Sequence, residues 1–92
     1  MKNIKEISKI INGFKDEKEV YHFFKELFTE AELIDLSKRW QILKMLNDGC
    51  TQREIASELK VSLCKVTRGS KIIKSKNAIA TKYLKNDKET KK

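Results

Sequence analysis

The sequence contains no proline, has only three glycines in 92 residues and lacks any long hydrophobic run. Proline and glycine interrupt helices and force turns more than other residues do, so their scarcity predicts a largely helical chain. No apolar stretch approaches the roughly 20 residues that a membrane-spanning helix needs, and the N-terminus lacks the apolar segment of a signal peptide. The length fits one domain. We therefore expect a single all-α domain in the cytoplasm, without a membrane partner.

Cysteine and histidine are scarce as well. Cys50 and Cys64 lack the spacing of metal ligands, and two cysteines are too few for a disulfide scaffold, so reduced cytoplasmic thiols are the simplest interpretation. His22 stands alone, without a partner in a recognisable catalytic pattern. The sequence also lacks Ser-His-Asp spacing, a glycine-rich phosphate loop and paired carboxylates in a cleft-like context. Nothing in it supports an enzymatic activity, a cofactor or a metal site.

The positive charge is confined to one half of the chain. Residues 1–48 contain nine Lys and Arg against nine Asp and Glu, whereas residues 49–92 contain twelve against four, so the second half carries the whole net charge of +8. A basic surface of this kind suits a polyanion such as nucleic acid. The alternative, a surface that only improves solubility, does not predict such a segregation.

Two helices are predicted before residue 29. Apolar residues recur at helical spacing from Ile4 to Phe14, and Asn12 and Gly13 end this first helix. A second helix starts at Asp16, and its apolar residues, many of them aromatic, cover a wide arc. Packing within the core is the base interpretation of that arc, but the short chain has little to cover it. Burial against a second chain is the natural alternative.

The third helix is predicted to be the centre of the fold. Thr29 and Glu32 form a T-x-x-E capping box at its start, and the helix should run to about Asn47. Its apolar residues, Trp40 among them, point in nearly every direction around the axis, and a helix that is apolar all round is buried all round. In a chain this short such burial requires a partner subunit. Residues 1–48 are therefore predicted to form the dimerisation helices of a homodimer.

The stretch over residues 51–74 predicts a helix-turn-helix. Thr51 and Glu54 form a second capping box, and Ser62 caps the helix that follows the turn. Val61 lies in the turn and is apolar enough to fill the angle between the two helices. A short basic helix held at a fixed angle is what reading a DNA groove requires. An ordinary helical hairpin is the alternative, but the charge distribution favours DNA.

The rest of the chain is predicted to continue as one helix and a tail. Ser75 is expected to cap a helix over residues 75–86, and a polar tail follows over residues 87–92. All of residues 1–92 would then belong to one domain.

Several sequence pieces resemble the tryptophan repressor family of bacteria. These are TQREIA, VTRGSKIIK and, upstream, FTEAELIDLSKRWQILKMLNDG, which cover residues 28–74. The segments VYHFFKELFTEAEL and KRWQILKML are most similar to the tryptophan-repressor-like proteins of other bacteria. The resemblance implies an intertwined homodimer with six helices per chain. It also implies a sequence-specific transcriptional repressor that binds a palindromic operator in double-stranded DNA.

The predicted DNA-binding positions combine the helix-turn-helix interpretation with this resemblance. Ser62, Lys65 and Lys71 are expected on or beside the outer face of the second helix. The resemblance implies that Arg53 of the first helix lies at the groove edge and that Lys71 and Lys74 contact phosphates. It also implies that the recognition helix carries Leu63, Cys64, Lys65 and Thr67. The full set is Arg53, Ser62, Leu63, Cys64, Lys65, Thr67, Lys71 and Lys74. Lys65 replaces a smaller hydroxyl residue of the family, which suggests an altered operator or stronger nonspecific affinity.

The resemblance further implies a pocket for L-tryptophan as corepressor. Arg39 and Arg68 would sandwich the indole ring, one of them meeting the carboxylate, and Gly69 would line the pocket. The backbone carbonyls of Phe28 and Thr29 would accept the ammonium group. Guanidinium planes stack on aromatic rings and pair with carboxylates, so the chemistry is sound.

Alternatives remain open at this stage. Arg39 could instead form a surface ion pair with Asp35 one helical turn earlier, and Arg68 could instead contact a phosphate. The protein could be a DNA-binding regulator that needs no ligand. From another class, it could be a helical module whose wide apolar faces bind a different protein. The sequence does not name the operator or the regulated genes.

Overall fold

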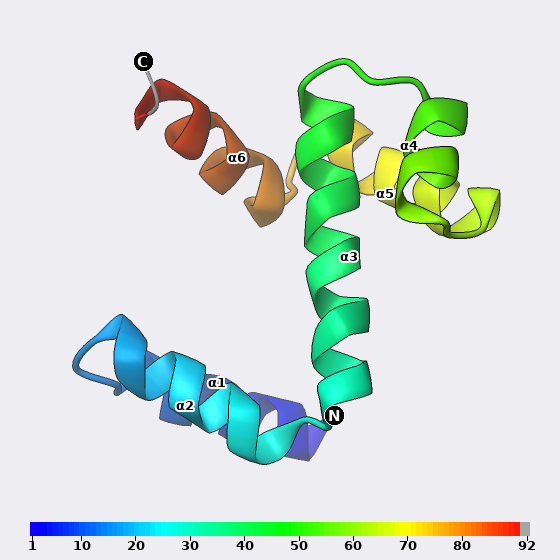
Figure 1. Cartoon of the computed structure of the whole chain (residues 1–92). Helices are drawn as coiled ribbons and strands as arrows, with labels where there is room; N and C mark the ends of the chain where they lie inside the picture. The colour runs from blue at the N-terminus through cyan, green and yellow to red at the C-terminus, as the bar shows by residue number, and fades with distance from the viewer. Residues whose placement is uncertain (91–92) are drawn as a thin grey trace. The chain divides into compact units, whose positions relative to one another are not determined.

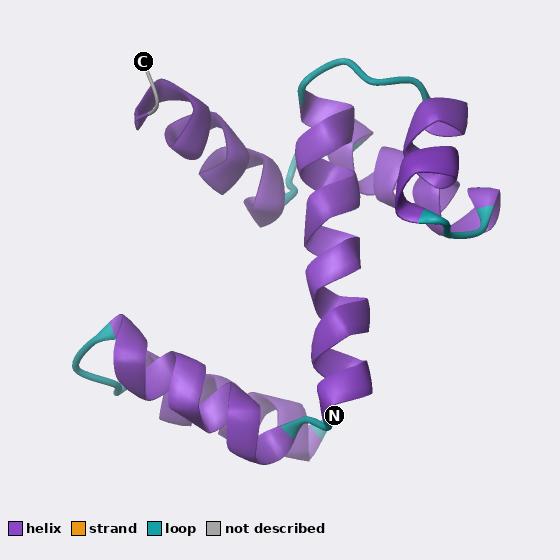
Figure 2. Ribbon diagram, in the orientation of Figure 1, coloured by secondary structure: helices purple, strands orange, loops and turns teal. Residues whose placement is uncertain are grey.

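The computed structural model describes residues 1–90, which form six α-helices and no strand (Figures 1 and 2). The helices are α1 (Lys2–Asn12), α2 (Glu17–Leu27), α3 (Glu30–Asn47), α4 (Gln52–Leu59), α5 (Leu63–Lys74) and α6 (Ile79–Thr90). The predicted all-helical class is confirmed. The chain divides into two compact units, one over Met1–Ile34 and one that begins at Asp35.

The N-terminal unit is built from helices with local caps and little burial. Asp16 accepts a hydrogen bond from the Glu19 N–H at 3.0 Å, as expected for the start of α2. Phe14 and Phe23 meet edge to face, with 5.4 Å between their ring centres. No residue of α1 or α2 is fully buried, and Tyr21 remains 66% exposed. The apolar stripes predicted from the sequence are therefore only partly covered within one chain.

Both ends of α3 follow the sequence prediction. The Glu32 N–H donates to Thr29 Oγ1 at 3.2 Å, and the Thr29 N–H donates to Glu32 Oε1 at 2.8 Å, so the capping box is present. At the other end Gly49 has a φ of +93°, a conformation that favours glycine because it has no Cβ. The Cys50 N–H then donates to the Met45 carbonyl at 3.0 Å and closes the helix.

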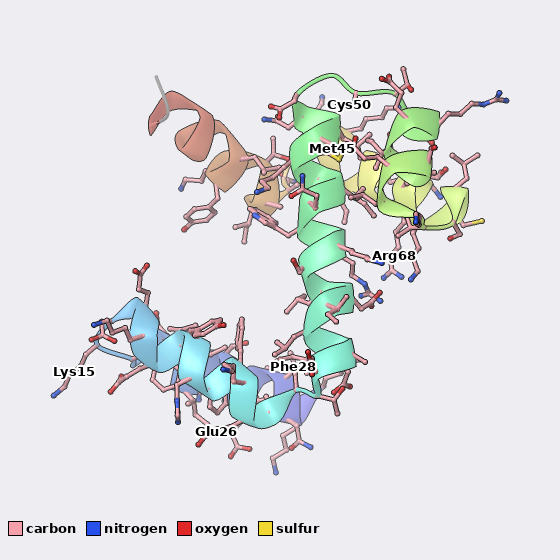
Figure 3. All side chains as sticks on the ribbon, in the orientation of Figure 1. Lys15, Glu26, Phe28, Met45, Cys50 and Arg68 are labelled. Carbon is pink, nitrogen blue, oxygen red and sulfur yellow. The ribbon has the colours of Figure 1, made fainter. Side chains whose placement is uncertain are left out.

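The core of the second unit joins three helices. Ile42 and Met45 of α3 pack with Ile55 of α4 and Val66 of α5, and Ile55 and Val66 are completely buried. The partly buried residues around this cluster are Leu46, Cys50, Ala56, Leu59 and Val61. Figure 3 shows Met45 on the part of α3 that lies beside α4 and α5. Val61, in the connection between α4 and α5, is thus packed against the core, in keeping with the apolar role predicted for it.

The connection between α4 and α5 depends on two caps and one left-handed residue. The Thr51–Glu54 capping box is complete, and Ser62 accepts from the Lys65 N–H at 3.3 Å. Lys60 ends α4 with φ 55° and ψ 47°, where glycine is the more usual residue. The Val61 N–H donates to the Ala56 carbonyl at 3.1 Å. These bonds fix where α5 begins relative to α4.

The predicted bounds of the last helix were wrong. Ser75 does not start a helix but ends α5, since its N–H donates to the Ile72 carbonyl at 3.1 Å and its backbone is extended. The final helix begins at Ile79 and runs to Thr90, so it includes most of the predicted polar tail. Residues 91–92 of that tail lie outside the described residues. A serine can cap the start of the helix that follows it or stand at the end of the helix before it. Here the backbone hydrogen bond to Ile72 makes Ser75 the C-terminal cap of the preceding helix.

Burial around α3 is one-sided within the single chain. Ile42, Leu43 and Met45 are buried, whereas Trp40 is 39% exposed and Ile34 is 52% exposed. The expectation that this helix is buried on all sides is therefore not met by the chain alone. Its burial by a second subunit stays a prediction.

Gly69 is the point of closest approach between α5 and α3. A Cβ atom at this position would lie 2.9 Å from Ile42 Cγ2 and 3.3 Å from Leu46 Cδ1. The first of these distances is shorter than Cβ contacts in folded proteins, and a methyl on the β-branched Ile42 has little freedom to move. The absence of a side chain at Gly69 lets the two helices pack at this distance.

We expect Gly69→Ala to destabilise the protein. Overpacking costs roughly 1–3 kcal/mol, while replacing glycine by alanine within a helix returns at most about 1 kcal/mol. The net loss should be about 1 kcal/mol or more, measured by urea unfolding at one fixed protein concentration. Gly13→Ala is the matched control, because a Cβ there meets ordinary contacts of 3.6 Å or more. A Gly69→Ala variant as stable as the Gly13→Ala variant would contradict this account of the helix crossing.

Candidate functional site

One face of α5 is open to solvent and carries half of the predicted DNA-binding residues. Leu63, Cys64, Thr67, Arg68 and Lys71 line one shallow, open surface. All five are exposed. The structure therefore brings together four of the predicted DNA-binding residues and adds Arg68 to the same face.

A hydrogen bond between Thr67 and Gln52 orients this face relative to α4. Thr67 Oγ1 lies 3.0 Å from Gln52 Oε1 on α4 and 3.0 Å from the Leu63 carbonyl one turn earlier on α5. Gln52 is half-buried at the start of α4, beside the Thr51–Glu54 capping box. Hydrogen bonds from Thr51 lower the pKa of the Glu54 carboxyl below its ordinary value, which favours the ionised carboxylate in the capping box. The outward face of α5 is thus fixed at its N-terminal end.

The other predicted cations of this set are exposed, and most of them have no partner. In the part of the chain that the structure describes, Arg53, Lys71 and Lys74 make no ion pair. An exposed cation without an internal partner is available to a phosphate group. Ser62 is exposed too, but its hydroxyl already serves as the cap of α5.

Lys65 is an exception, because its ammonium group is held by a carboxylate of α3. Lys65 Nζ lies 3.2 Å from Asp35 Oδ1, and Arg39 Nη2 lies 3.2 Å from Asp35 Oδ2. The hydrogen bond from Lys65 lowers the pKa of Asp35, and the charges of Lys65, Arg39 and Lys38 lower it further, while partial desolvation opposes them. One carboxylate therefore bridges cations from two helices. The surface ion pair that the sequence offered as an alternative for Arg39 is present.

A cavity of about 240 Å³ lies next to this ion-pair cluster, between α3 and α5. Its lining residues are Arg39, Ile42, Leu43, Lys65, Arg68, Gly69 and Ile72. The apolar side chains and Gly69 supply an apolar wall, and three cations supply its polar part. Figure 3 marks Arg68 on α5. The structure thus brings together Arg39, Arg68 and Gly69, as the resemblance implied for a ligand pocket. The volume suits a ligand smaller than a typical drug molecule.

The two carbonyl groups expected to accept an ammonium group belong to the N-terminal unit. Phe28 ends α2, and Thr29 precedes α3 (Figure 3 labels Phe28). The Thr29 carbonyl already accepts the Leu33 N–H at 3.0 Å. Neither residue lines the cavity next to Arg39.

The Asp35–Lys65 contact is the feature of this site that sequence reasoning missed. The two residues are 30 positions apart on different helices. A spacing of four on one helix indicates a contact, and it correctly suggested Asp35 and Arg39. A contact across two helices requires their crossing, for which the sequence gives no comparable signal.

Other kinds of site find no support in the described residues. Among the residues whose side chains are described, 1–84, no group of three or more His, Cys, Asp or Glu is placed to hold a metal ion. His22 pairs with Glu26 on the surface, at 3.4 Å. The same part of the chain contains no helix that is both long and apolar enough to cross a membrane.

Comparison with known proteins places the chain in a family. The Trp repressor protein family matches residues 2–88. The chain is 30% identical over 89 residues to the uncharacterized protein YerC of Bacillus subtilis, covering 94% of this chain and 86% of that protein. It is 37% identical over 70 residues to a Trp operon repressor homolog of Chlamydia caviae, with 74% and 69% covered. For a Trp operon repressor homolog of Chlamydia trachomatis, the identity is 32% over 79 residues, with 85% and 84% covered.

No solved structure matches the chain. The family match nevertheless covers nearly the whole sequence, and the family is regulatory and DNA-binding rather than enzymatic. We conclude that this chain belongs to the Trp repressor family.

Proposed function

We propose that the protein is a sequence-specific transcriptional repressor that binds a palindromic DNA operator as a homodimer, with L-tryptophan as its corepressor. The observation that carries this proposal is the exposed face of α5, where unpaired cations flank Thr67 and Cys64 on a helix fixed against α4. A helix held in this way, in a chain of this family, suits insertion into the major groove.

In this proposal α4 and α5 are a helix-turn-helix, and α5 is the recognition helix. Leu63, Cys64 and Thr67 would face base edges. Lys71 and Lys74, near the C-terminal end of α5, would contact phosphates, as would Arg53 on α4 and Ser62 at the turn. Base contacts supply sequence preference and phosphate contacts supply position and affinity. Lys65 belongs to the proposed DNA-binding set too, but it must leave Asp35 to reach DNA.

The homodimer is proposed because the apolar surface of the dimerisation helices exceeds what one chain covers. Ile34, Leu36 and Trp40 of α3 and Tyr21 of α2 are all at least 39% exposed. Large apolar side chains left exposed on the helices of a small domain favour burial against another chain. A two-fold dimer would present two copies of α5 to half-sites about one helical turn of DNA apart, roughly 34–36 Å.

L-tryptophan is proposed as the corepressor because the cavity offers guanidinium groups beside an apolar wall. Arg39 and Arg68 would stack on the indole ring and meet the carboxylate, with Gly69 at the wall, and Phe28 and Thr29 would supply carbonyls for the ammonium group. A ligand-independent regulator is the second candidate. The observation in its favour is that Asp35 already forms ion pairs with both Arg39 and Lys65.

We expect the protein to be a dimer in solution at micromolar concentration, as measured by light scattering. Trp40→Asp should weaken this dimer strongly, because it would place an unpaired charge in the buried contact. Asn77→Asp is the control, since it introduces the same charge at an exposed polar residue between α5 and α6. A monomeric mass for the unmodified protein would exclude the proposed assembly.

We expect DNA affinity to depend on the exposed cations of α4 and α5. Log affinity falls as log salt concentration rises, and each phosphate-contacting cation that is removed should make this slope less negative by about one. Lys71→Ala and Lys74→Ala should show this in electrophoretic shift assays at several salt concentrations. Lys9→Ala on α1 has the same charge change and should leave the slope as it is. The quadruple variant of Arg53, Lys65, Lys71 and Lys74 to alanine must lose binding while it stays folded, or the assignment is wrong.

We expect millimolar L-tryptophan to raise operator affinity, and operator DNA to raise tryptophan affinity by the same factor. The ligand can do this only if it prefers the DNA-binding arrangement to others. Arg39→Ala should abolish the tryptophan response. Arg68→Ala should lose both ligand binding and the response, whereas Lys74→Ala should lose DNA affinity alone. If operator affinity is the same with and without tryptophan, the ligand-independent regulator becomes the better description.

A further inference from the structure

The carboxylate of Asp35 pairs with two of the cations that line the cavity, as the anionic group of a ligand would be expected to do. Its two oxygens are each 3.2 Å from a cation, Oδ1 from Lys65 Nζ and Oδ2 from Arg39 Nη2. Both cations line the cavity between α3 and α5. A carboxylate that bridges an ammonium and a guanidinium group uses the contacts that these groups offer to any carboxylate.

The charges around the cavity do not balance. Arg39, Lys65 and Arg68 contribute three positive charges. Among the described residues, Asp35 is the acid paired with them, and Arg68 has no ion pair. The cavity therefore attracts an anion even with Asp35 in place. Since Asp35 and its two partners are all partly exposed to solvent, their ion pairs are weak enough to exchange.

We propose that Asp35 occupies the anion site of this cavity in the ligand-free protein, and that a ligand carboxylate binds by displacing it from Arg39 and Lys65. The proposal rests on the proposed function in one respect, that the cavity binds a carboxylate-bearing aromatic ligand. It makes Asp35 an internal competitor of the ligand. It also gives Lys65 a role in the cavity, as a third cation for the ligand carboxylate, besides its proposed place in the DNA-binding set.

This competition lowers the affinity of the cavity for carboxylate ligands. A ligand must replace two charge-assisted hydrogen bonds of Asp35, so part of its own interaction energy is offset. Removing the Asp35 charge should tighten the binding of ligands with a carboxylate and give no gain to ligands without one. Removing the Lys65 charge should weaken the binding of carboxylates.

The test measures ligand binding by isothermal titration calorimetry on the full chain without DNA. The probes are L-tryptophan, L-tryptophanamide, which lacks the carboxylate, and benzoate, which lacks the ammonium group. Asp35→Asn should bind L-tryptophan and benzoate about two- to fivefold more tightly than the parent, and Lys65→Met about two- to fivefold more weakly. L-tryptophanamide should gain nothing from Asp35→Asn.

Two variants control for net charge alone. Glu58→Gln on α4 and Lys76→Met after α5 change the charge by the same amount at exposed positions outside the cavity. Both should bind the probes as the parent does. Circular dichroism of each variant checks that the helices are retained.

The outcomes separate this proposal from the proposed function. If benzoate follows the predicted order while L-tryptophan binds to no variant, tryptophan is not the corepressor but Asp35 is the internal competitor. If Asp35→Asn weakens L-tryptophan and leaves benzoate unchanged, Asp35 receives the ligand's ammonium group and the proposal is overturned. It is also overturned if Asp35→Asn changes neither affinity, or if neither probe binds to any variant. None of these outcomes depends on DNA binding, because the titrations are done without DNA.

Discussion

The close packing of α5 against α3 at Gly69 is the contact on which the rest of the second unit depends. Because Gly69 has no side chain, Ile42 and Leu46 approach the backbone of α5, and Val66, one turn earlier, becomes fully buried with Ile55. The same crossing forms the apolar wall of the cavity and places Arg68 at its edge. Stability and the candidate ligand site therefore rest on one helix contact. A change at this crossing would alter both.

The cations of α5 fall into two groups with different surroundings. Lys71 and Lys74 are exposed and unpaired among the described residues, as groups that meet phosphates should be. Lys65 instead meets a carboxylate of α3 and lines the cavity. The sequence could not separate these groups, because all of them appear as basic residues on one short helix. The direction of the Lys65 side chain follows from where α3 crosses α5, which is a tertiary property.

Much of the local structure was predictable because it depends on neighbours in sequence. The capping boxes at Thr29 and Thr51, and the cap at Ser62, each involve residues three positions apart, and all are present. Ser75 was misassigned because a serine suits either end of a helix, and the backbone bonds that decide between them are not encoded in its identity. The grouping of Arg39, Arg68 and Gly69 in one cavity followed from family resemblance, while the part of Asp35 in it required the crossing of two helices.

The position of Arg68 has a consequence for how such a regulator can diversify. This residue lies both on the outward face of α5 and at the edge of the cavity, whereas Lys71 lies on the outward face alone. If the outward face reads DNA and the cavity holds a ligand, a substitution at Arg68 changes both recognition events together. Substitutions at Thr67 or Cys64 can alter the DNA target without changing the lining of the cavity. New operators are therefore more readily reached through those two positions, whereas at Arg68 a change of DNA target also changes the ligand site.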